Sequence, residues 1–235
     1  MYSEILYRDS DAIVCVKPAG IPSESHGLPE LIAAQEAIPL PFPVHRLDKP
    51  AGGAIILAVD SRACASLQQA FVSGLVIKEY LAAVSGTLPD SSGTFTDLLY
   101  HDSARNKTYV VDRARKGVKK AVCGWKVLQT VYAQNEPVSL LQIRLQTGRT
   151  HQIRVQFASR KMPLIGDRRY GSPIHLDGDR IALWSFHLQF PASSDERKTV
   201  SVYSRPPAVF PWNCFTAGVT DSHAPAALSS GLLLP

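Results

Sequence analysis

The stretch VHRLDKPAGGAIILAVD, from Val44 to Asp60, joins a cluster of polar side chains to a run of apolar ones. Residues Gly53–Val59 are apolar and partly β-branched, which predicts a buried strand. His45, Arg46 and Asp48 lie just before it, on a loop that ends in a glycine pair. A strand does not need three such groups at its start, so they either satisfy one another or meet a molecule from outside.

Composition limits the class of protein. The chain has 235 residues, of which 45% are hydrophobic, enough to bury a core in one large or two small domains. Its four cysteines are widely spaced, without a CxxC pair or clustered histidines, so we expect neither a metal site nor a disulfide framework. No apolar stretch approaches a membrane-spanning length. These features predict a cytoplasmic protein that contacts no membrane.

Positive charge is concentrated in two tracts. The formal net charge is +5, whereas Arg105–Lys120 carries +6 and Arg149–Arg169 carries +5, so the rest of the chain is acidic at −6. Such tracts are often only solvated loops. Lysine and arginine also bind phosphates and release counterions, which gives affinity for nucleic acid without regard to sequence. Two separate tracts favour nucleic acid as the partner.

Periodicity and turn signals predict strands interspersed with helices. The predicted strands are Ala12–Val16, Gly53–Val59, Val76–Val84, Ala121–Gln129, Leu141–Gln146 and Ala182–Phe190. The predicted helices are Pro29–Ala37, a segment that starts at Asp60 or Ser61 and ends near Gly74, and Thr150–Ala158. Most connections are too short for repeated helical crossovers, so we expect an α+β fold: a mixed, largely antiparallel central sheet with flanking helices and loops. Residues 1–212 are expected to form the domain, and residues 213–235 a flexible tail.

Three motifs carry polar groups whose purpose the residues alone leave open. Asp48, beside His45 and Arg46, is ionised at neutral pH and could be a nucleophile or base, or an ion pair that closes the turn. Tyr80 lies on a predicted strand, where a tyrosine usually packs. The segment TGRTHQIR, from Thr147 to Arg154, could bind phosphate at a helix start, or could be an ordinary capped helix with a basic face.

Several motifs in the same order resemble the RluA-type pseudouridine synthases, which isomerise selected uridines in structured RNA. They are VKPAGIPS (16–23), HRLD (45–48), KEYLAAVSG (78–86), GVKKAVCGWKVL (117–128), TGRTHQIRV (147–155), PLIGDRRYG (163–171) and IALWSFHLQF (181–190). The resemblance covers about Ala12 to Tyr203. Two stretches depart from the family pattern: Pro50-Ala51-Gly52 replaces a Thr-Ser-Gly stretch, and Leu183-Trp184-Ser185 replaces Leu-His-Ala. These departures concern loop geometry and substrate choice more than the chemistry.

The resemblance implies roles for three catalytic residues. Asp48 is the catalytic carboxylate, which attacks the glycosidic carbon, attacks the uracil ring, or removes a ribose proton to give a glycal. Arg154 resembles the arginine that pairs with that aspartate and keeps it ionised and oriented. Tyr80 resembles the tyrosine that stacks on the uracil and accepts the final proton. A base inside a helix is out of reach, so the target must flip out of the stack.

The partner implied is an RNA stem-loop, ribosomal or transfer, and we expect a monomer that uses no cofactor and no metal. The residues expected to bind RNA are His45, Arg46, Lys78, Lys119, Lys120, Arg149, His151, Gln152, Arg168 and Arg169. Two other functions stay open. A catalytically silent RNA-binding protein would keep the basic tracts, and a ribonuclease using His45 or His151 with Asp48 would shorten the RNA.

Overall fold

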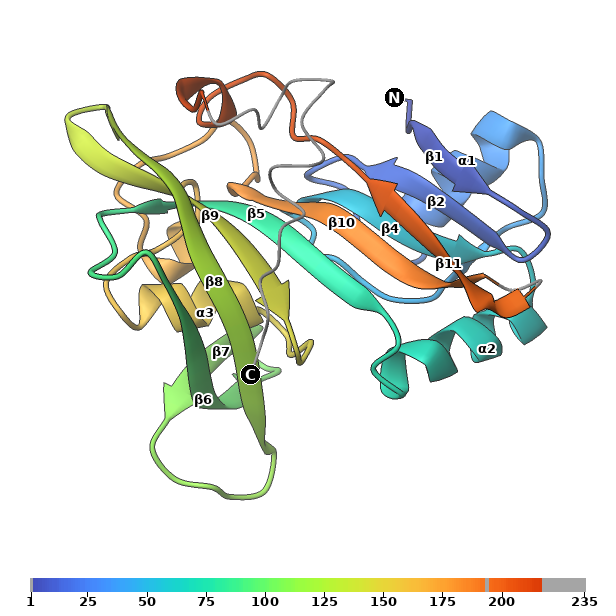
Figure 1. The fold of residues 1–235 in the computed structure, drawn as a ribbon, viewed down its shortest axis with the longest axis horizontal. Coiled ribbons are helices and arrows are strands. Elements are labelled where there is room, and N and C mark those ends of the chain that lie inside the picture. The colour runs from blue at the N-terminus through green and yellow to red at the C-terminus, as the bar shows by residue number, and fades with distance from the viewer. Residues whose placement is uncertain (1, 193–194, 217–235) are drawn as a thin grey trace. The chain divides into compact units, whose positions relative to one another are not determined.

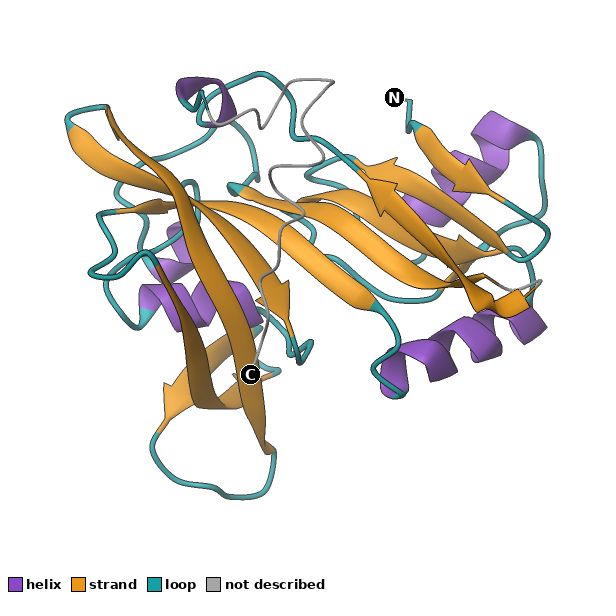
Figure 2. Cartoon of the chain, in the orientation of Figure 1, coloured by secondary structure: helices purple, strands orange, loops and turns teal. Residues whose placement is uncertain are grey.

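A computed structural model describes residues 2–192 and 195–216. The chain forms two compact units. Unit 1 comprises residues 1–79 and 184–206, and unit 2 comprises residues 80–183 and the chain from residue 207 onward. Strands predominate over helices in each unit (Figures 1 and 2). The predicted α+β fold with a mixed, largely antiparallel sheet is confirmed.

Unit 1 is built on strands that pair around β4. The strands are β1 (Ile5–Arg8), β2 (Ala12–Lys17), β3 (Phe42–Pro43), β4 (Gly52–Ala58), β10 (Leu183–Ala192) and β11 (Asp195–Tyr203). Their order is β1-β2-β4-β10, with β11 paired to β10 and β3 paired to β4. The pairing of β4 with β10 is parallel, and the other pairs of this unit are antiparallel. This one parallel pair makes the sheet mixed.

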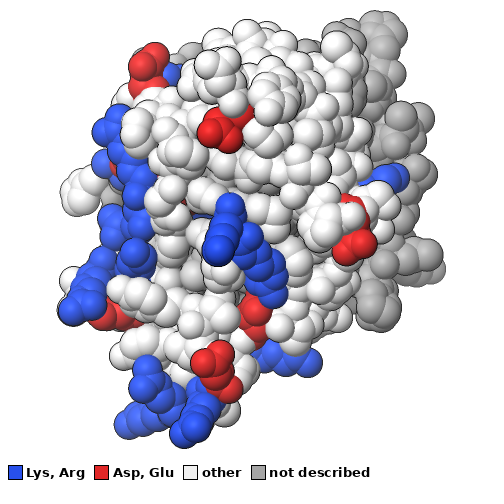
Figure 3. All heavy atoms as spheres, turned by 90° about the vertical axis from the view of Figure 1, so that its left-hand side faces the viewer, with Lys and Arg blue, Asp and Glu red and all other residues white. Residues whose placement is uncertain are grey.

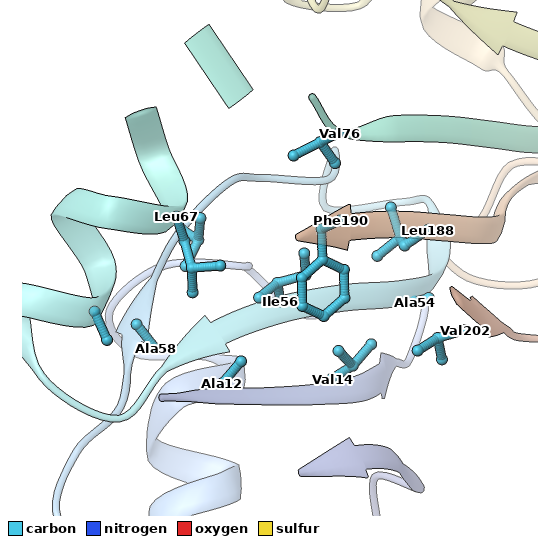
Figure 4. Close-up of a cluster of buried hydrophobic side chains, with 12 residues drawn as sticks. Ala12, Val14, Ala54, Ile56, Ala58, Leu67, Val76, Leu188, Phe190 and Val202 are labelled. Atoms are coloured by element: carbon cyan, nitrogen blue, oxygen red, sulfur yellow. The ribbon is translucent and has the colours of Figure 1, made fainter. Parts of the chain in front are cut away.

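Strand β4 is buried along its whole length. Both of its edges are paired, β2 along one and β10 and β3 along the other, which explains why its sequence is an uninterrupted apolar run. Ile56 lies in a cluster with Val14, Leu188 and Phe190 (Figure 4). The apolar half of the opening stretch therefore forms the centre of the unit 1 core, and its polar half is the loop that leads into it.

Two helices belong to unit 1, α1 (Leu28–Glu36) and α2 (Ser61–Val72). Helix α2 begins as the sequence predicts, because the Asp60 carboxylate accepts a hydrogen bond of 2.7 Å from the backbone N–H of Ala63. Leu67 is buried in the cluster with the strands of the sheet (Figure 4). Ala63 is buried in the same cluster, and Phe71 packs against it partly buried. The apolar residues at helical spacing are therefore the ones that pack.

The described residues of unit 2 form five strands in the order β5-β9-β8-β6-β7. They are β5 (Ile77–Ser85), whose first residues belong to unit 1, β6 (Ser92–Asp102), β7 (Lys107–Val111), β8 (Val118–Ala133) and β9 (Glu136–Leu145). A two-residue turn joins β8 to β9. Both of its residues, Gln134 and Asn135, have positive φ, as the tight hairpin turns that match strand twist require.

The basic tract Arg105–Lys120, in which the sequence pattern predicted no strand, contains β7 and the start of β8. Strand β7 lies at the end of the strand order, paired with β6. Charged side chains are common on such edge strands because they discourage pairing with another chain. Strand β7 itself has one charged residue, Lys107, but it is short, and the charged residues on either side of it hid it from a reading based on apolar periodicity.

Helix α3 (Gln152–Ala158) contacts β6 and β7 of unit 2, where Phe157 meets Phe95 with ring centroids 5.0 Å apart. The unit also has two 3₁₀ turns, η1 (Arg168–Tyr170) and η2 (Trp212–Cys214). Phe215 is buried, and the backbone N–H of Thr216 donates to the Gln129 side chain at 2.9 Å. The rest of the predicted tail, residues 217–235, lies outside the described residues.

Candidate functional site

The HRLD loop of unit 1 is tied to the segment that follows β2. The hydroxyl of Ser23 donates to the carbonyl of Leu47 at 2.8 Å and accepts from its N–H at 3.0 Å. Leu47 is buried, whereas Asp48 is only half-buried. The N–H of Ala51 donates to the carbonyl of Asp48 at 2.9 Å, which closes a turn directly before β4. The loop is therefore held by its backbone, and the Asp48 side chain is partly accessible.

A buried lysine adds a second anchor. The Nζ of Lys17, at the end of β2, donates to the carbonyls of Pro18, Ile21 and Lys49 at 3.0, 2.8 and 3.1 Å. Lys17 is fully buried, and burial lowers its pKa to about 8, although the nearby Asp48 carboxylate acts in the opposite direction. This role of Lys17 was not predicted from the sequence. The signal for it was present, since Lys17 is the second residue of the VKPAGIPS motif.

His45 packs inside unit 1. Its Nε2 accepts a hydrogen bond of 3.0 Å from the N–H of Ile56, and its ring lies 4.8 Å from the Phe71 ring, centroid to centroid. Burial, together with the nearby Lys78 ammonium, lowers the pKa of His45 to about 3. The imidazole is therefore neutral at physiological pH. His45 can therefore contact RNA only as an uncharged ring, and its Nε2 is already hydrogen-bonded to Ile56 of β4.

Arg46 and Lys78 are the cations of unit 1 that were expected to bind RNA. Arg46 is exposed, and its guanidinium lies 3.1 Å from the exposed carboxylate of Glu24, a surface pair that adds little stability. Lys78 is half-buried, with its Nζ 5.4 Å from the centre of the Phe71 ring. The same ring therefore contacts both His45 and Lys78, and it brings these two predicted residues together.

Trp184, in one of the two stretches that depart from the family pattern, lies against Gly52, the position of the other stretch at which the pattern also has glycine. Gly52 and Trp184 are opposite residues of the parallel β4–β10 pair, and a Cβ on Gly52 would overlap atoms of the Trp184 indole. The indole N–H donates to the Ser204 hydroxyl at 3.2 Å, and the side chain is 7% exposed. A residue with a side chain at position 52 would displace this ring, so the glycine and the tryptophan form a matched pair.

Tyr80 lies on β5 in unit 2 and is 6% exposed. Its neighbour Glu79 is also buried, and the Glu79 carboxylate lies 3.1 Å from Nδ1 of His187 on β10. Successive residues of a strand point to opposite faces. The contact with His187 places the Glu79 side chain on one face of β5. The Tyr80 side chain therefore lies on the opposite face.

Arg154 on α3 forms a two-point ion pair within unit 2. Its Nε and one terminal nitrogen donate to the two carboxylate oxygens of Asp167 at 2.6 and 2.9 Å, and both side chains are buried. Paired hydrogen bonds of this kind fix the plane of a guanidinium as well as its position. Asp167 was not recognised from the sequence, although it lies in the PLIGDRRYG motif. The predicted pairing of Arg154 with Asp48 of unit 1 stays a prediction.

His151 and Gln152 lie at the start of α3 and are buried. His151 has a positive φ, and its Nδ1 lies 3.0 Å from the Tyr170 hydroxyl. The Gln152 side-chain oxygen accepts from the N–H of Arg149 at 3.0 Å and from the Thr147 hydroxyl at 2.8 Å. Gln152 thus closes the turn before α3, and it occupies a backbone N–H of the segment that was considered for phosphate binding.

The remaining predicted RNA-binding residues are exposed cations of unit 2: Lys119, Lys120, Arg149, Arg168 and Arg169. The Nε of Arg149 donates to the carbonyl of Lys120 at 3.1 Å, so the two basic tracts meet at this point. Figure 3 shows the side of the molecule that carries the unit 2 hairpins, with Lys and Arg gathered along one side and at the lower end. This arrangement presents a band of positive charge to a polyanion.

Within residues 2–192 and 195–216, no group of three or more His, Cys, Asp and Glu side chains is placed to hold a metal ion. The helices in the same part of the chain include none that is long and apolar enough to cross a membrane.

Comparison with known proteins gives one consistent family. The family model for RNA pseudouridylate synthases matches residues 11–159. The chain is 31% identical over 214 residues to an uncharacterized RNA pseudouridine synthase of Zymomonas mobilis, with 88% of this chain and 94% of the relative covered. It is 32% identical over 183 residues to ribosomal large subunit pseudouridine synthase D of Xylella fastidiosa, with 74% and 53% covered.

The chain is shorter than some of these relatives. It is 32% identical over 208 residues to an uncharacterized RNA pseudouridine synthase of Aquifex aeolicus, and the match spans 79% of this chain but 64% of the relative. Among solved structures, human RNA pseudouridylate synthase domain containing 1 superposes with a TM-score of 0.77 at 24% identity, covering 88% of this chain and 85% of the other. This likeness shows a common fold.

Proposed function

We infer that this chain, which belongs to the RNA pseudouridylate synthase family, converts a specific uridine of a structured RNA to pseudouridine with Asp48 as the catalytic carboxylate. The family reaction breaks the bond between the ribose C1′ and uracil N1, turns the base, and joins C1′ to C5. The proton that C5 carried then leaves, and N1 takes up a proton in place of its bond to C1′, so the product is an isomer of the substrate. No electrons are gained or lost, and no group donor is consumed.

One observation carries the assignment of Asp48. Its loop is fixed at the backbone by Ser23 and by the buried Lys17, while Asp48 itself is only half-buried. A carboxylate held in this way can reach a substrate without moving the backbone, as catalysis by a positioned group requires. The three routes open to it are attack on C1′, attack on the uracil ring, and removal of a ribose proton.

Tyr80 and Arg154 complete the proposed catalytic group. Tyr80 offers an aromatic face on which the flipped uracil stacks and a hydroxyl that accepts the C5 proton. Arg154 pairs with Asp48 and keeps it ionised, in line with the family pattern. The buried pair with Asp167 supports this role because it holds the guanidinium in one orientation.

The RNA is held by the exposed cations of unit 2 and by Arg46. We propose a stem-loop of ribosomal or transfer RNA as the substrate, because a base in a loop flips out at a lower cost than one in a helix. The name of the Xylella relative favours the large ribosomal subunit. We also propose that the enzyme acts as a cytoplasmic monomer without a cofactor or metal, so turnover should persist in EDTA on RNA whose fold is shown to be intact.

The test compares Asp48→Asn with Asp90→Asn, which changes an exposed carboxylate of unit 2. Pseudouridine is mapped in RNA from cells that lack the gene and carry each variant, and it is measured on the mapped RNA in vitro. We expect no product with Asp48→Asn, normal product with Asp90→Asn, and RNA of unchanged length with both. Appreciable turnover by a folded Asp48→Asn protein would remove Asp48 from the chemistry, and shortened RNA would indicate a ribonuclease.

A further inference from the structure

Tyr170, at the end of η1, joins two parts of unit 2 that are far apart in the sequence. Its hydroxyl accepts a hydrogen bond of 2.8 Å from the N–H of Thr108 on β7, and it lies 3.3 Å from the carbonyl of the same residue. It also lies 3.0 Å from Nδ1 of His151. Three contacts by one hydroxyl tie the basic strand β7 to the start of α3.

The ring of Tyr170 makes a second kind of contact. The guanidinium carbon of Arg154 lies 5.2 Å from the ring centre, and the Nζ of Lys107 lies 5.5 Å from it. Both distances lie within the range at which a cation is attracted by an aromatic face. The same side chain therefore touches the proposed catalytic arginine and a cation of the basic tract.

The backbone around η1 strengthens this link. The carbonyl of Asp167 accepts hydrogen bonds from the N–H groups of Tyr170 at 3.1 Å and Ser172 at 3.0 Å, while the Asp167 carboxylate holds Arg154. Arg169 donates to the carbonyls of Arg105 and Asn106 at 3.0 Å each, in the turn between β6 and β7. Successive residues of one short turn thus hold Arg154, the β6–β7 turn and β7 itself.

We propose that Tyr170 is a positioning residue for the isomerisation: its hydroxyl fixes β7 to His151, and its ring supports the guanidinium of Arg154. RNA that binds Lys107, the cation of β7, is thereby placed in a set relation to Arg154. This inference rests on the proposed function, because it assigns Arg154 to the chemistry. None of the sequence motifs was assigned this role, and Tyr170 was not among the predicted site residues.

The experiment uses Tyr170→Phe, which keeps the ring and removes the three hydroxyl contacts. Tyr132→Phe is the matched control, because Tyr132 is 79% exposed near the end of the β8–β9 hairpin. The single-turnover rate of pseudouridine formation is measured at saturating enzyme, alongside RNA affinity. We expect the rate of Tyr170→Phe to fall about 10-fold while the Kd for RNA changes less than about 2-fold. Tyr132→Phe should match the wild type.

Two further measurements separate positioning from general stability. In an Arg154→Lys background, Tyr170→Phe should lower the rate by less than about 2-fold, because residues that act through one another are not additive. Exchange of the Thr108 N–H with water, followed by NMR, should speed up in Tyr170→Phe, which loses the hydroxyl that accepts it, and exchange of the Arg154 Nε–H should speed up in Tyr170→Leu, which also loses the ring. If the rate losses of Arg154→Lys and Tyr170→Phe multiply in the double variant, the two residues act independently. That result would overturn the proposal.

The exchange measurement also separates this inference from the proposed function. If the wild-type protein makes no pseudouridine, the proposed function fails, and faster exchange of the Arg154 Nε–H in Tyr170→Leu still supports the positioning of Arg154. If the wild type is active but Tyr170→Phe and Tyr170→Leu both have its full rate and unchanged exchange, Tyr170 does not position Arg154 and the inference is wrong.

Discussion

The ammonium group of Lys17 lies 3.1 Å from the carbonyl oxygen of Lys49, the residue that follows Asp48. This bond crosses from the end of β2 to the HRLD loop and is made by a side chain without solvent exposure. Because a charged lysine is costly to bury, its presence here indicates that the loop conformation depends on it.

The first prediction concerns pH. The pKa of Lys17 is about 8 in the folded protein and 10.5 for the ordinary group, so the unfolded chain binds more protons between these values. The contribution of Lys17 to the free energy of unfolding therefore increases as pH rises from about 8 toward 10.5. The free energy of unfolding of wild type relative to Lys17→Met should grow by roughly 1 to 2 kcal/mol between pH 8 and pH 9.5.

Urea denaturation of the two proteins at several pH values measures this difference, and the other titrating groups cancel in the comparison. Lys17→Met should also be less stable than wild type at pH 7, by about 2 to 4 kcal/mol, because carbonyl groups lose their donor. A difference that stays constant or narrows with rising pH would contradict the assignment of a buried, charged Lys17.

The second prediction concerns His45, whose pKa of about 3 lies below its ordinary 6.5. Stability from this group is fully present above pH 6.5 and is lost as pH falls toward 3, because only the unfolded state takes up the proton. We expect a loss of roughly 2 kcal/mol between pH 7.5 and pH 5. His45→Gln keeps an acceptor for the Ile56 N–H, and its free energy of unfolding should change less with pH in the same denaturation experiment. If the free energy of unfolding changes equally with pH in wild type and His45→Gln, the pKa of His45 is not lowered in the folded protein.

The third prediction concerns RNA affinity. Lys119 and Lys120 are exposed on β8 within the first basic tract. If both touch phosphate, changing both to Gln should reduce the slope of log affinity against log salt concentration by about one to two units. Lys126→Gln is the control, because Lys126 is exposed on the same strand but outside the tract. An unchanged slope in the double variant places these lysines away from the RNA.

The fourth prediction separates the two proposed roles of Tyr80. Phenylalanine keeps the stacking face and loses the hydroxyl, whereas alanine also loses stacking worth about 1 to 3 kcal/mol. We expect Tyr80→Phe to bind RNA nearly normally and to isomerise slowly, and Tyr80→Ala to weaken engagement of the flipped base as well. Single-turnover formation of pseudouridine at saturating enzyme measures the chemical step. A wild-type rate for Tyr80→Phe would leave Tyr80 as a stacking or packing residue only.

Local sequence determined several elements of this protein directly. Asp60 followed by apolar residues at helical spacing predicted α2, and the cap and buried face are both present. The uninterrupted apolar run after the glycine pair predicted β4 as a buried strand. These features depend on residues a few positions apart, so a linear pattern contains them. The order of motifs likewise identified the family that the comparisons show.

Tertiary structure alone decided which side chains meet. Asp167 lies 13 residues from Arg154, and Lys17 lies 32 residues from Lys49, so their contacts depend on how distant segments pack. Burial then decided the ionisation of His45, which the sequence presented as a polar loop residue. Sequence patterns record local periodicity and residue type, whereas the pairing and desolvation of polar groups arise only when separate elements come into contact.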